Sequence, residues 1–523
     1  MNRVRPGKSA AHPAGAGCRT LLVVALLGAM LTSSGCTSLR QWWANGAKVG
    51  PNYARPAEPV AQTWVDARDP RVKCDPANDC AWWTVFNDPT LNGLIESAYR
   101  QNLDLRVAGT RILEARAQRN ISVGNMFPQS QTATGAYAHA QISRNLNLPF
   151  PGQVNVWATG FNASWEADFW GRYRRTIESS DADLAATTEG YGDTLVLLLS
   201  EVATSYVQLR TFEERLQLAQ KNVAAQRGSA GLAEQRFNKG VATELDMRQA
   251  RSNLAQTEAL IPPLEVGRRQ AANRLCILMG MPVTDLAAQL RPAPIPRAPL
   301  EVAVGIPADL LRRRPDIRQA ERQVASQSAL IGVAEADLYP RFSINGFLGY
   351  AASDFKDLFA SRSLLGFAVP MFQWNVLNYG RITNNVRVQQ ARLEGATYQY
   401  QQTVLKAGRE VEDALVAFLQ SQQQAARLEE SVNEAQRSVE LVVLQFEGGV
   451  TDFNRVYTTQ STMVTQQDQW AQTRGDIAIN LIDVYRSLGG GWQYFFNRPT
   501  VQAAGAVEVV QPPAAGPERL PTP

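Results

Sequence analysis

The side chains that most often carry catalysis are few in this chain of 523 residues. It has two histidines, His12 and His139, and five scattered cysteines, so the sequence shows no nucleophile beside a base and no set of metal ligands. His139 falls in a segment of alternating residues, and we expect it to line a strand rather than to bind a ligand. The sequence therefore predicts neither an enzyme nor a metal or cofactor site.

One cysteine is placed for a covalent modification. Basic residues precede an apolar run at 21–31, which is shorter than the roughly 20 residues that span a bilayer, and the sequence TSSG then leads to Cys36. This order resembles a bacterial lipoprotein signal, which implies removal of the first 35 residues and a diacylglycerol and palmitate on Cys36. Such signals usually have Leu where this chain has Ser33, so cleavage by the ordinary signal peptidase is the alternative. Thr37, in place of Asp, resembles lipoproteins sorted to the outer membrane.

Cys74 and Cys80 lie in the sequence CDPANDC, whose Pro, Asn and Asp residues favour a turn. In an oxidising compartment this spacing predicts a local disulfide, and two unpaired thiols in a loop are the alternative. Cys276, inside the apolar sequence RLCILM, is expected to be a small buried side chain.

The elements that would position any site occur twice. Four pairs of landmarks recur with a spacing of 209 to 212 residues: 104–108 with 316–320, Pro128 with Pro340, Gly171 with Gly380, and Gly240 with Gly449. Their order and spacing indicate the duplication of one long unit rather than a solenoid of short repeats.

Each copy begins with a helix and a pair of strands. Residues 91–126 contain no proline and predict a helix, and the alternation of Trp157, Phe161 and Trp165 with small or polar residues predicts a strand. The predicted strands are about 129–141, 155–170, 341–350 and 362–373. Strands of about 10 residues with one apolar face suit a transmembrane β-barrel, although a soluble sandwich would show similar alternation.

Each copy continues with a proline-free stretch, which predicts long helices at 172–238 and 381–447. Apolar residues from Leu195 to Val223 recur in steps of three and four, as along a coiled-coil seam. At 1.5 Å per residue each helix would be roughly 100 Å long, which suits a rod crossing the periplasm better than a globular domain.

Glycine ends each long helix, because it adopts the left-handed conformation that follows a helix C-terminus. After Gly240 and Gly449 come Thr243 and Thr451, whose hydroxyls are expected to cap the returning helices.

The predicted organisation is as follows: signal peptide 1–35, anchored and equatorial segment 36–90, first repeat 91–280 with return helix 243–280, linker 281–307, second repeat 308–488 with return helix 452–488, and disordered tail 489–523.

Charge and strand number limit the partners. With 52 basic and 48 acidic residues the net charge is only +4, which argues against a nucleic-acid partner.

Four strands cannot close a barrel, because known barrels start at eight, and open edges in lipid leave backbone groups unpaired. The chain must therefore oligomerise, and 8, 12 or 16 strands are all compatible with four-stranded units.

Several motifs together resemble one family, the outer membrane efflux proteins, which are the TolC-type and NodT-type factors of tripartite pumps. The motifs are VGPNYARP at 49–56, WW at 82–83, FNDPTL at 86–91, GVATELD at 240–246, RRPDIR at 313–318 and SLGGGW at 487–492. The resemblance implies an α+β membrane protein. It would form a homotrimer whose 12-stranded barrel, with four strands per chain, continues into a long periplasmic α-helical barrel.

The resemblance also implies a location, partners and a gate. The chain would be an outer-membrane lipoprotein, in contact with outer-membrane lipids, that docks through its turns on a periplasmic membrane-fusion adaptor and serves an inner-membrane RND-type transporter. The docking residues would be Gly240, Val241, Thr243, Gly449, Val450 and Thr451. Where relatives usually have Asp and Arg in the second turn, this chain has Thr458 and Ser461, so we expect Glu244, Asp246, Asp452 and Arg455 to supply the gate charges. For Glu244 and Asp452, a role as ordinary acids at a helix N-terminus is the alternative.

The sequence thus predicts a passive exit duct for drugs or other small toxic compounds. Two alternatives stay open. One is an exit duct for type I protein secretion, and the other is a non-conducting lipoprotein scaffold with a periplasmic coiled coil.

Overall fold

The computed structural model describes residues 39–74, 79–141, 153–286 and 290–496. The predicted signal peptide, the lipidation site Cys36 and most of the predicted tail lie outside the described residues. The chain divides into two compact units. Among the described residues, we call 39–52, 125–176 and 329–387 the sheet unit, and we call 53–124, 177–328 and 388–496 the helical unit.

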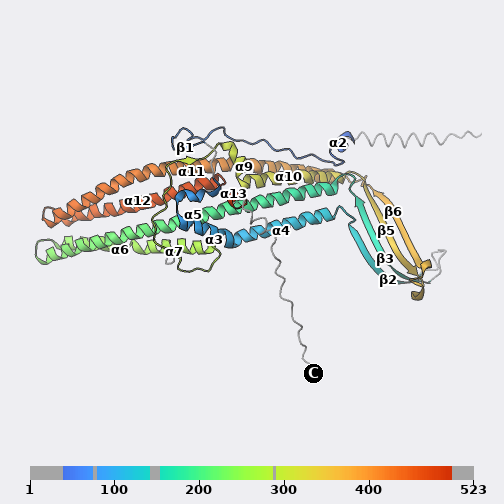
Figure 1. Cartoon of the computed structure of the whole chain (residues 1–523), viewed down its shortest axis with the longest axis horizontal. Helices are drawn as coiled ribbons and strands as arrows, with labels where there is room; N and C mark the ends of the chain where they lie inside the picture. The colour runs from blue at the N-terminus through green and yellow to red at the C-terminus, as the bar shows by residue number, and fades with distance from the viewer. Residues whose placement is uncertain (1–38, 75–78, 142–152, 287–289, 497–523) are drawn as a thin grey trace, which may run out of the picture. The chain divides into compact units, whose positions relative to one another are not determined.

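The sheet unit contains one antiparallel sheet of four strands in the order β2-β3-β5-β6 (Figure 1). The strands are β2 (Ser130–Gln141), β3 (Gln153–Ala167), β5 (Arg341–Ala352) and β6 (Leu364–Gln373). β2 pairs with β3 and β5 pairs with β6, so each copy of the duplicated unit contributes two adjacent strands, and the β3–β5 pairing joins the two copies. β3 ends three residues earlier than predicted, because Asp168 instead accepts hydrogen bonds from Tyr173 N and Arg174 N at the start of the next helix.

Large apolar side chains of this sheet are exposed, among them Phe161 at 68%, Leu348 at 60% and Phe367 at 52%. β2 and β6 lie at the two edges, and neither has a second partner strand within the part of the chain that the structure describes. An exposed apolar surface and an unpaired strand edge both favour binding to another protein chain or to a membrane. The sheet is therefore built to be covered by other molecules.

The two long helices have the bounds that the sequence predicts. α5 covers Arg172–Asn238 and α11 covers Arg381–Glu447, each with 67 residues. The predicted apolar seam of α5 is buried, with Leu195, Val202 and Tyr206 all at 0% exposure. No helix of the described residues combines the length and the apolar character needed to cross a membrane.

The other elements are shorter. Among the described residues, the remaining helices of more than ten residues are α3 (Pro89–Gln101), α4 (Leu103–Gly124), α6 (Glu244–Glu258), α7 (Ile261–Leu278), α10 (Pro315–Ala336) and α12 (Phe453–Ser487). The short elements are α2 (Leu39–Ala44), β1 (Val72–Lys73), η1 (Asp79–Phe86), β4 (Val302–Ala303), η3 (Pro307–Asp309), α9 (Leu310–Arg313), η4 (Phe355–Asp357), η5 (Ser361–Ser363) and α13 (Trp492–Phe496).

The single helix predicted at 91–126 is wrong, because the structure has two helices that meet at Asn102. The side chain of Asn102 is buried, donates to Leu278 O at 2.9 Å and accepts from Leu105 N at 2.8 Å. The amide thus caps α4 and holds α7 at the same time, which local helix propensity does not reveal.

Two further expectations need correction. Cys74, directly after β1, and Cys80, in η1, are both free and exposed, so the predicted disulfide is not formed in this structure. The predicted tail from residue 489 is ordered as far as residue 496, because Phe495 of α13 is fully buried. Its ring stacks on Tyr99 with centroids 4.0 Å apart and on Trp83 with centroids 5.8 Å apart.

The RRPDIR motif forms a polar centre in the helical unit. The guanidinium of Arg314 is nearly buried and contacts Asp316 at 2.7 Å, Glu410 at 2.8 Å and Ser487 O at 2.8 Å. Burial, and then the nearby charge of Asp316, raise the pKa of Asp193 in α5 from 3.8 to about 6. Asp193 therefore keeps its proton to a higher pH in the folded protein than in the unfolded chain.

This raised pKa predicts a stability that depends on pH. Because the folded state binds the Asp193 proton more tightly than the unfolded state, the contribution is complete below about pH 4 and is lost as the pH rises through about 6. This contribution of Asp193 to the free energy of unfolding is at most about 3 kcal/mol. Asp193→Asn should flatten the pH dependence of the thermal unfolding midpoint between pH 4.5 and 7.5. An unchanged slope, equal to that of the exposed-site control Asp181→Asn, would contradict the assignment.

Candidate functional site at the helix tips

The two turns that join the long helices to the returning helices lie at the same end of the helical unit (Figure 1). In the first turn, Gly240 adopts φ +71° and Val241 N donates to Arg236 O at 2.9 Å. In the second turn, Gly449 adopts φ +73° and Val450 N donates to Gln445 O at 2.9 Å. These bonds from beyond the glycine satisfy the last carbonyls of α5 and α11, as in a Schellman motif.

The returning helices are capped in two different ways. Thr243 caps α6 in a capping box, in which its Oγ1 accepts from Asp246 N at 3.2 Å and its N donates to Asp246 Oδ2 at 3.0 Å. In the second turn the cap of α12 is Asp452, which accepts from Arg455 N at 3.2 Å, and not the predicted Thr451. At this position a carboxylate stabilises the helix more than a threonine hydroxyl does, because its negative charge complements the positive end of the helix dipole.

Asp246 joins the two turns. While its Oδ2 closes the capping box of α6, its Oδ1 accepts a hydrogen bond from Phe453 N at 3.1 Å, at the first residue of α12. Burial alone would raise the pKa of Asp246, but hydrogen bonds from Thr243 and Phe453 and the charge of Arg236 lower it below its ordinary value. One side chain thus accepts hydrogen bonds from backbone N–H groups at the start of two helices, at Thr243 and at Phe453, which is 207 residues further along the chain than Asp246.

Arg236 makes the reciprocal link from α5 to α11. Its Nη1 donates to Phe446 O at 2.8 Å and to Glu447 O at 2.9 Å, and its guanidinium lies 5.1 Å from the centroid of the Phe446 ring. A cation at the end of α11 satisfies free carbonyls and complements the negative end of the helix dipole. Next to these links, the rings of Phe446 and Phe453 pack edge to face with centroids 5.4 Å apart.

The four predicted gate residues have different surroundings. Asp246 is half-buried and contacts the second turn, whereas Glu244 pairs with Arg248 at 3.0 Å on its own helix. Asp452 is exposed and caps its own helix, and Arg455 is exposed. Arg236 was not among the site residues predicted from the sequence. A basic residue in the last turn of a helix is nevertheless a signal for binding free carbonyls at a helix C-terminus.

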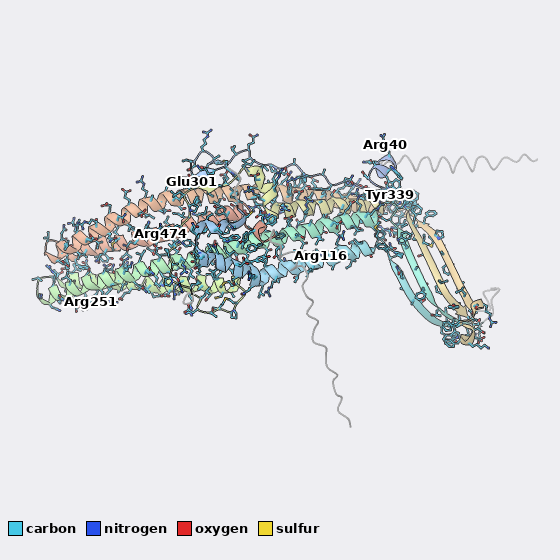
Figure 2. The ribbon with its side chains drawn as sticks, in the orientation of Figure 1. Arg40, Arg116, Arg251, Glu301, Tyr339 and Arg474 are labelled. Atoms are coloured by element: carbon cyan, nitrogen blue, oxygen red, sulfur yellow. The ribbon has the colours of Figure 1, made fainter. Side chains whose placement is uncertain are left out.

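Apolar side chains project from both turns. Val241 is 60% exposed, Leu245 is 65% exposed and Val450 is 78% exposed. Between the turns lies a cleft of about 490 Å³ that is lined by both glycines, both valines, Arg236 and Asp246, among others. Charged residues lie nearby, since Arg251 of α6, which is labelled in Figure 2, is on the same helix as Asp246. Arg251 pairs with Glu234 of α5 at 2.7 Å. The tips thus combine exposed apolar contacts with ionised groups, which is an arrangement suited to a protein partner.

Comparison with known proteins gives a consistent result. The family model "Outer membrane efflux protein" matches residues 94–281 and 306–490. Nodulation protein T of Rhizobium leguminosarum bv. trifolii is 29% identical over 82% of this chain and 92% of its own length. Pyoverdine export outer membrane protein OpmQ of Pseudomonas putida is 30% identical over 79% of this chain and 89% of its own length.

Solved structures agree with these relatives. The outer-membrane channel OprN is 32% identical, with a TM-score of 0.81 over 85% of this chain and 99% of OprN. The structure of CusC, a cation efflux system protein in Escherichia coli, is 26% identical, with a TM-score of 0.73 over 85% of this chain and 100% of CusC.

Proposed function

Because the chain belongs to the outer membrane efflux protein family, we propose that it is the passive outer-membrane exit duct of a tripartite efflux system. The observation that carries this proposal is the combination, in one chain, of a four-stranded sheet that exposes large apolar side chains with two helices of 67 residues each. The likeness to the channel OprN over 85% of the chain supports it. The strands would lie in the outer membrane and the long helices would extend into the periplasm.

The proposed assembly is a homotrimer with a 12-stranded barrel. The edge strands β2 and β6 would pair between neighbouring copies, because an open edge in lipid would leave the outward-facing backbone groups without hydrogen bonds. Three copies of a duplicated chain would place six similar helical hairpins around one tube.

The tips are the proposed docking site and gate. Val241 and Val450, with the turn residues Gly240, Thr243, Gly449 and Thr451, would contact a periplasmic adaptor that recruits an inner-membrane RND-type transporter. Glu244, Asp246, Asp452 and Arg455 would supply the charges of the constriction. The link from Asp246 to Phe453 N supports a role in holding the tips closed.

The N-terminus is the proposed lipid anchor. A diacylglycerol and palmitate on Cys36 would attach the chain to the outer membrane beside its strands. Labelling with radioactive palmitate should mark the wild-type protein and not Cys36→Ser. Labelling of both or of neither would contradict acylation at Cys36.

The cargo is proposed only as small toxic compounds. Relatives carry names that refer to cation efflux, pyoverdine export and toluene efflux, so the family accepts chemically different cargo.

A planar-bilayer recording of the purified protein tests the duct directly, and we expect discrete single-channel conductance. A deletion strain should become more susceptible to some compounds in a drug panel, with recovery on complementation. A protein without conductance would be the scaffold alternative, and a conducting protein whose deletion blocks only the secretion of a protein would be a secretion duct.

A further inference from the structure

The short helix α2 is fixed to one end of the sheet. The indole of Trp42 stacks on Phe169 with centroids 5.2 Å apart and lies 5.7 Å from Trp170. Trp170 in turn stacks on Tyr339, which precedes β5, with centroids 4.5 Å apart. Figure 2 shows Arg40 of α2 and Tyr339 at this same end of the sheet unit.

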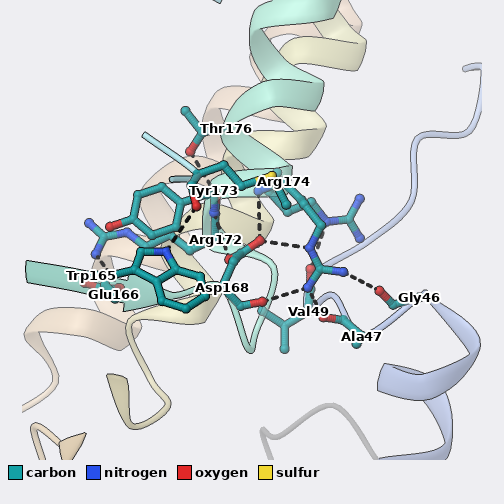
Figure 3. A network of polar contacts seen from close by, with 12 residues as sticks. Gly46, Ala47, Val49, Trp165, Glu166, Asp168, Arg172, Tyr173, Arg174 and Thr176 are labelled. Carbon is teal, nitrogen blue, oxygen red and sulfur yellow. Dashed lines mark hydrogen bonds and ion pairs between the residues drawn. The ribbon is translucent and has the colours of Figure 1, made fainter. Parts of the chain in front are cut away.

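The residues after α2 are also held. Arg174 Nη1 donates to Gly46 O at 2.7 Å and its Nη2 donates to Ala47 O at 2.8 Å (Figure 3). Asp168 fixes this guanidinium by accepting from its Nε at 2.8 Å, and Val49 N donates to Trp170 O at 3.0 Å. These bonds set the position of α2 relative to the sheet.

Other side chains of α2 are not covered by any of the described residues. Trp43 is 76% exposed although it directly follows the packed Trp42, and Arg40 is exposed as well. A large apolar ring and a guanidinium left exposed on one short helix are typical of segments that lie in a membrane interface.

The surrounding residues suggest what covers this side. At the same end of the sheet, Trp165 Nε1 donates to Met126 O at 3.2 Å and Trp374 Nε1 donates to Leu338 O at 2.9 Å. Phe127 and Phe372 are 64% and 69% exposed there. Aromatic residues gathered at the end of lipid-facing strands mark the level of the lipid headgroups.

We propose that α2 lies in the phospholipid interface, with the Trp43 ring among the headgroups and the Arg40 guanidinium at their phosphates. The inference rests on the proposed function, in which the sheet spans the outer membrane. The length of chain before α2 agrees with it, because only two residues separate Cys36 from Leu39. Three residue steps reach at most about 11 Å, so acyl chains on Cys36 would enter the bilayer next to α2.

Spin labels test this placement in the full-length protein. Cysteines replace Trp43 and, separately, Arg40, in a background in which the exposed thiols are removed by Cys74→Ser and Cys80→Ser. Reference labels replace Phe161, in the middle of β3, and Val65, which is 83% exposed in the helical unit. The protein is reconstituted in phosphatidylcholine and phosphatidylglycerol vesicles, and the accessibility of each label to oxygen and to a water-soluble nickel complex is measured.

At positions 43 and 40 we expect accessibility to the nickel complex to be several-fold lower than at position 65, and accessibility to oxygen to be lower than at position 161. Labels as accessible to nickel as position 65 would place α2 in water and overturn the proposal. Exclusion of both reagents would overturn it in favour of contact with another copy of the chain. A label at 161 that does not report hydrocarbon would refute the membrane-spanning sheet itself, so the two failures are distinguishable.

Discussion

Asp246→Ala should give channels with a higher single-channel conductance than the wild type, and cells that carry it should admit antibiotics that the wild-type channel excludes. The substitution removes the acceptor for Thr243 N and for Phe453 N at the same time. Only the bond to Phe453 N joins the two turns, and the loss of a side-chain acceptor at a helix N-terminus costs about 1 kcal/mol. Thr243 still caps α6 in this variant, because its Oγ1 accepts from the backbone N of residue 246. Arg455→Ala should have the same direction and a smaller effect, because Arg455 is exposed.

The matched control is Glu234→Ala. It removes a carboxylate of α5, together with its bond to Arg251 of α6 at 2.7 Å, but leaves the link from Asp246 to Phe453 N intact. We expect wild-type conductance and no leak from this variant. If conductance and leak stay at wild-type values in both Asp246→Ala and Arg455→Ala, the tips are not the gate. If Glu234→Ala leaks as much as Asp246→Ala, the loss of a charge rather than of the link is responsible.

The long helices could be predicted from the sequence because their signals are local. Apolar steps of three and four from Leu195 onward predict a buried seam, and glycines 240 and 449 mark where the helices end. Neither signal needs information from a distant part of the chain. The bounds of α5 and α11 therefore agree with the pattern, residue for residue.

The links within the candidate site could not be predicted in the same way. The sequence shows Arg236 as a base before the first turn and Asp246 as an acid after it. Their partners, Phe446 O and Phe453 N, lie about 210 residues away. The partners are also backbone atoms, whose availability depends on where α11 ends and α12 begins. Asp246 could therefore be predicted as a gate charge, but its bonds to the backbone at the start of both returning helices could not.

The same limit applies to the short elements. β1 and β4 have only two residues each and exist because Val72 pairs with Val302 across the helical unit. The break at Asn102 depends on the carbonyl of Leu278. In both cases a contact between distant residues overrides local propensity, which would continue a helix or leave a loop.

Gly50→Ala should sharply reduce the amount of folded, heat-modifiable protein in the outer membrane, whereas Gly46→Ala should reduce it little. Both glycines have left-handed backbones, with φ +83° and +68°, so alanine costs about 1–2 kcal/mol of strain at either position. A Cβ at Gly46 meets nothing within 4 Å, but a Cβ at Gly50 would overlap Gly332 Cα and lie 2.8 Å from Gly332 N. Because these atoms are backbone, they cannot rotate away, and overpacking adds about 1–3 kcal/mol.

Gly332→Ala separates the clash from the strain. Gly332 lies in α10 with an ordinary helical backbone, yet its Cβ would lie 2.8 Å from Val49 O and 2.9 Å from the Arg175 side chain. If close packing of residues 46–52 against α10 fixes the base of the sheet, Gly332→Ala should resemble Gly50→Ala, although it introduces no left-handed strain. Equal yields of the Gly50→Ala and Gly46→Ala proteins would show that this packing contributes nothing, and that the cost at both positions is strain alone.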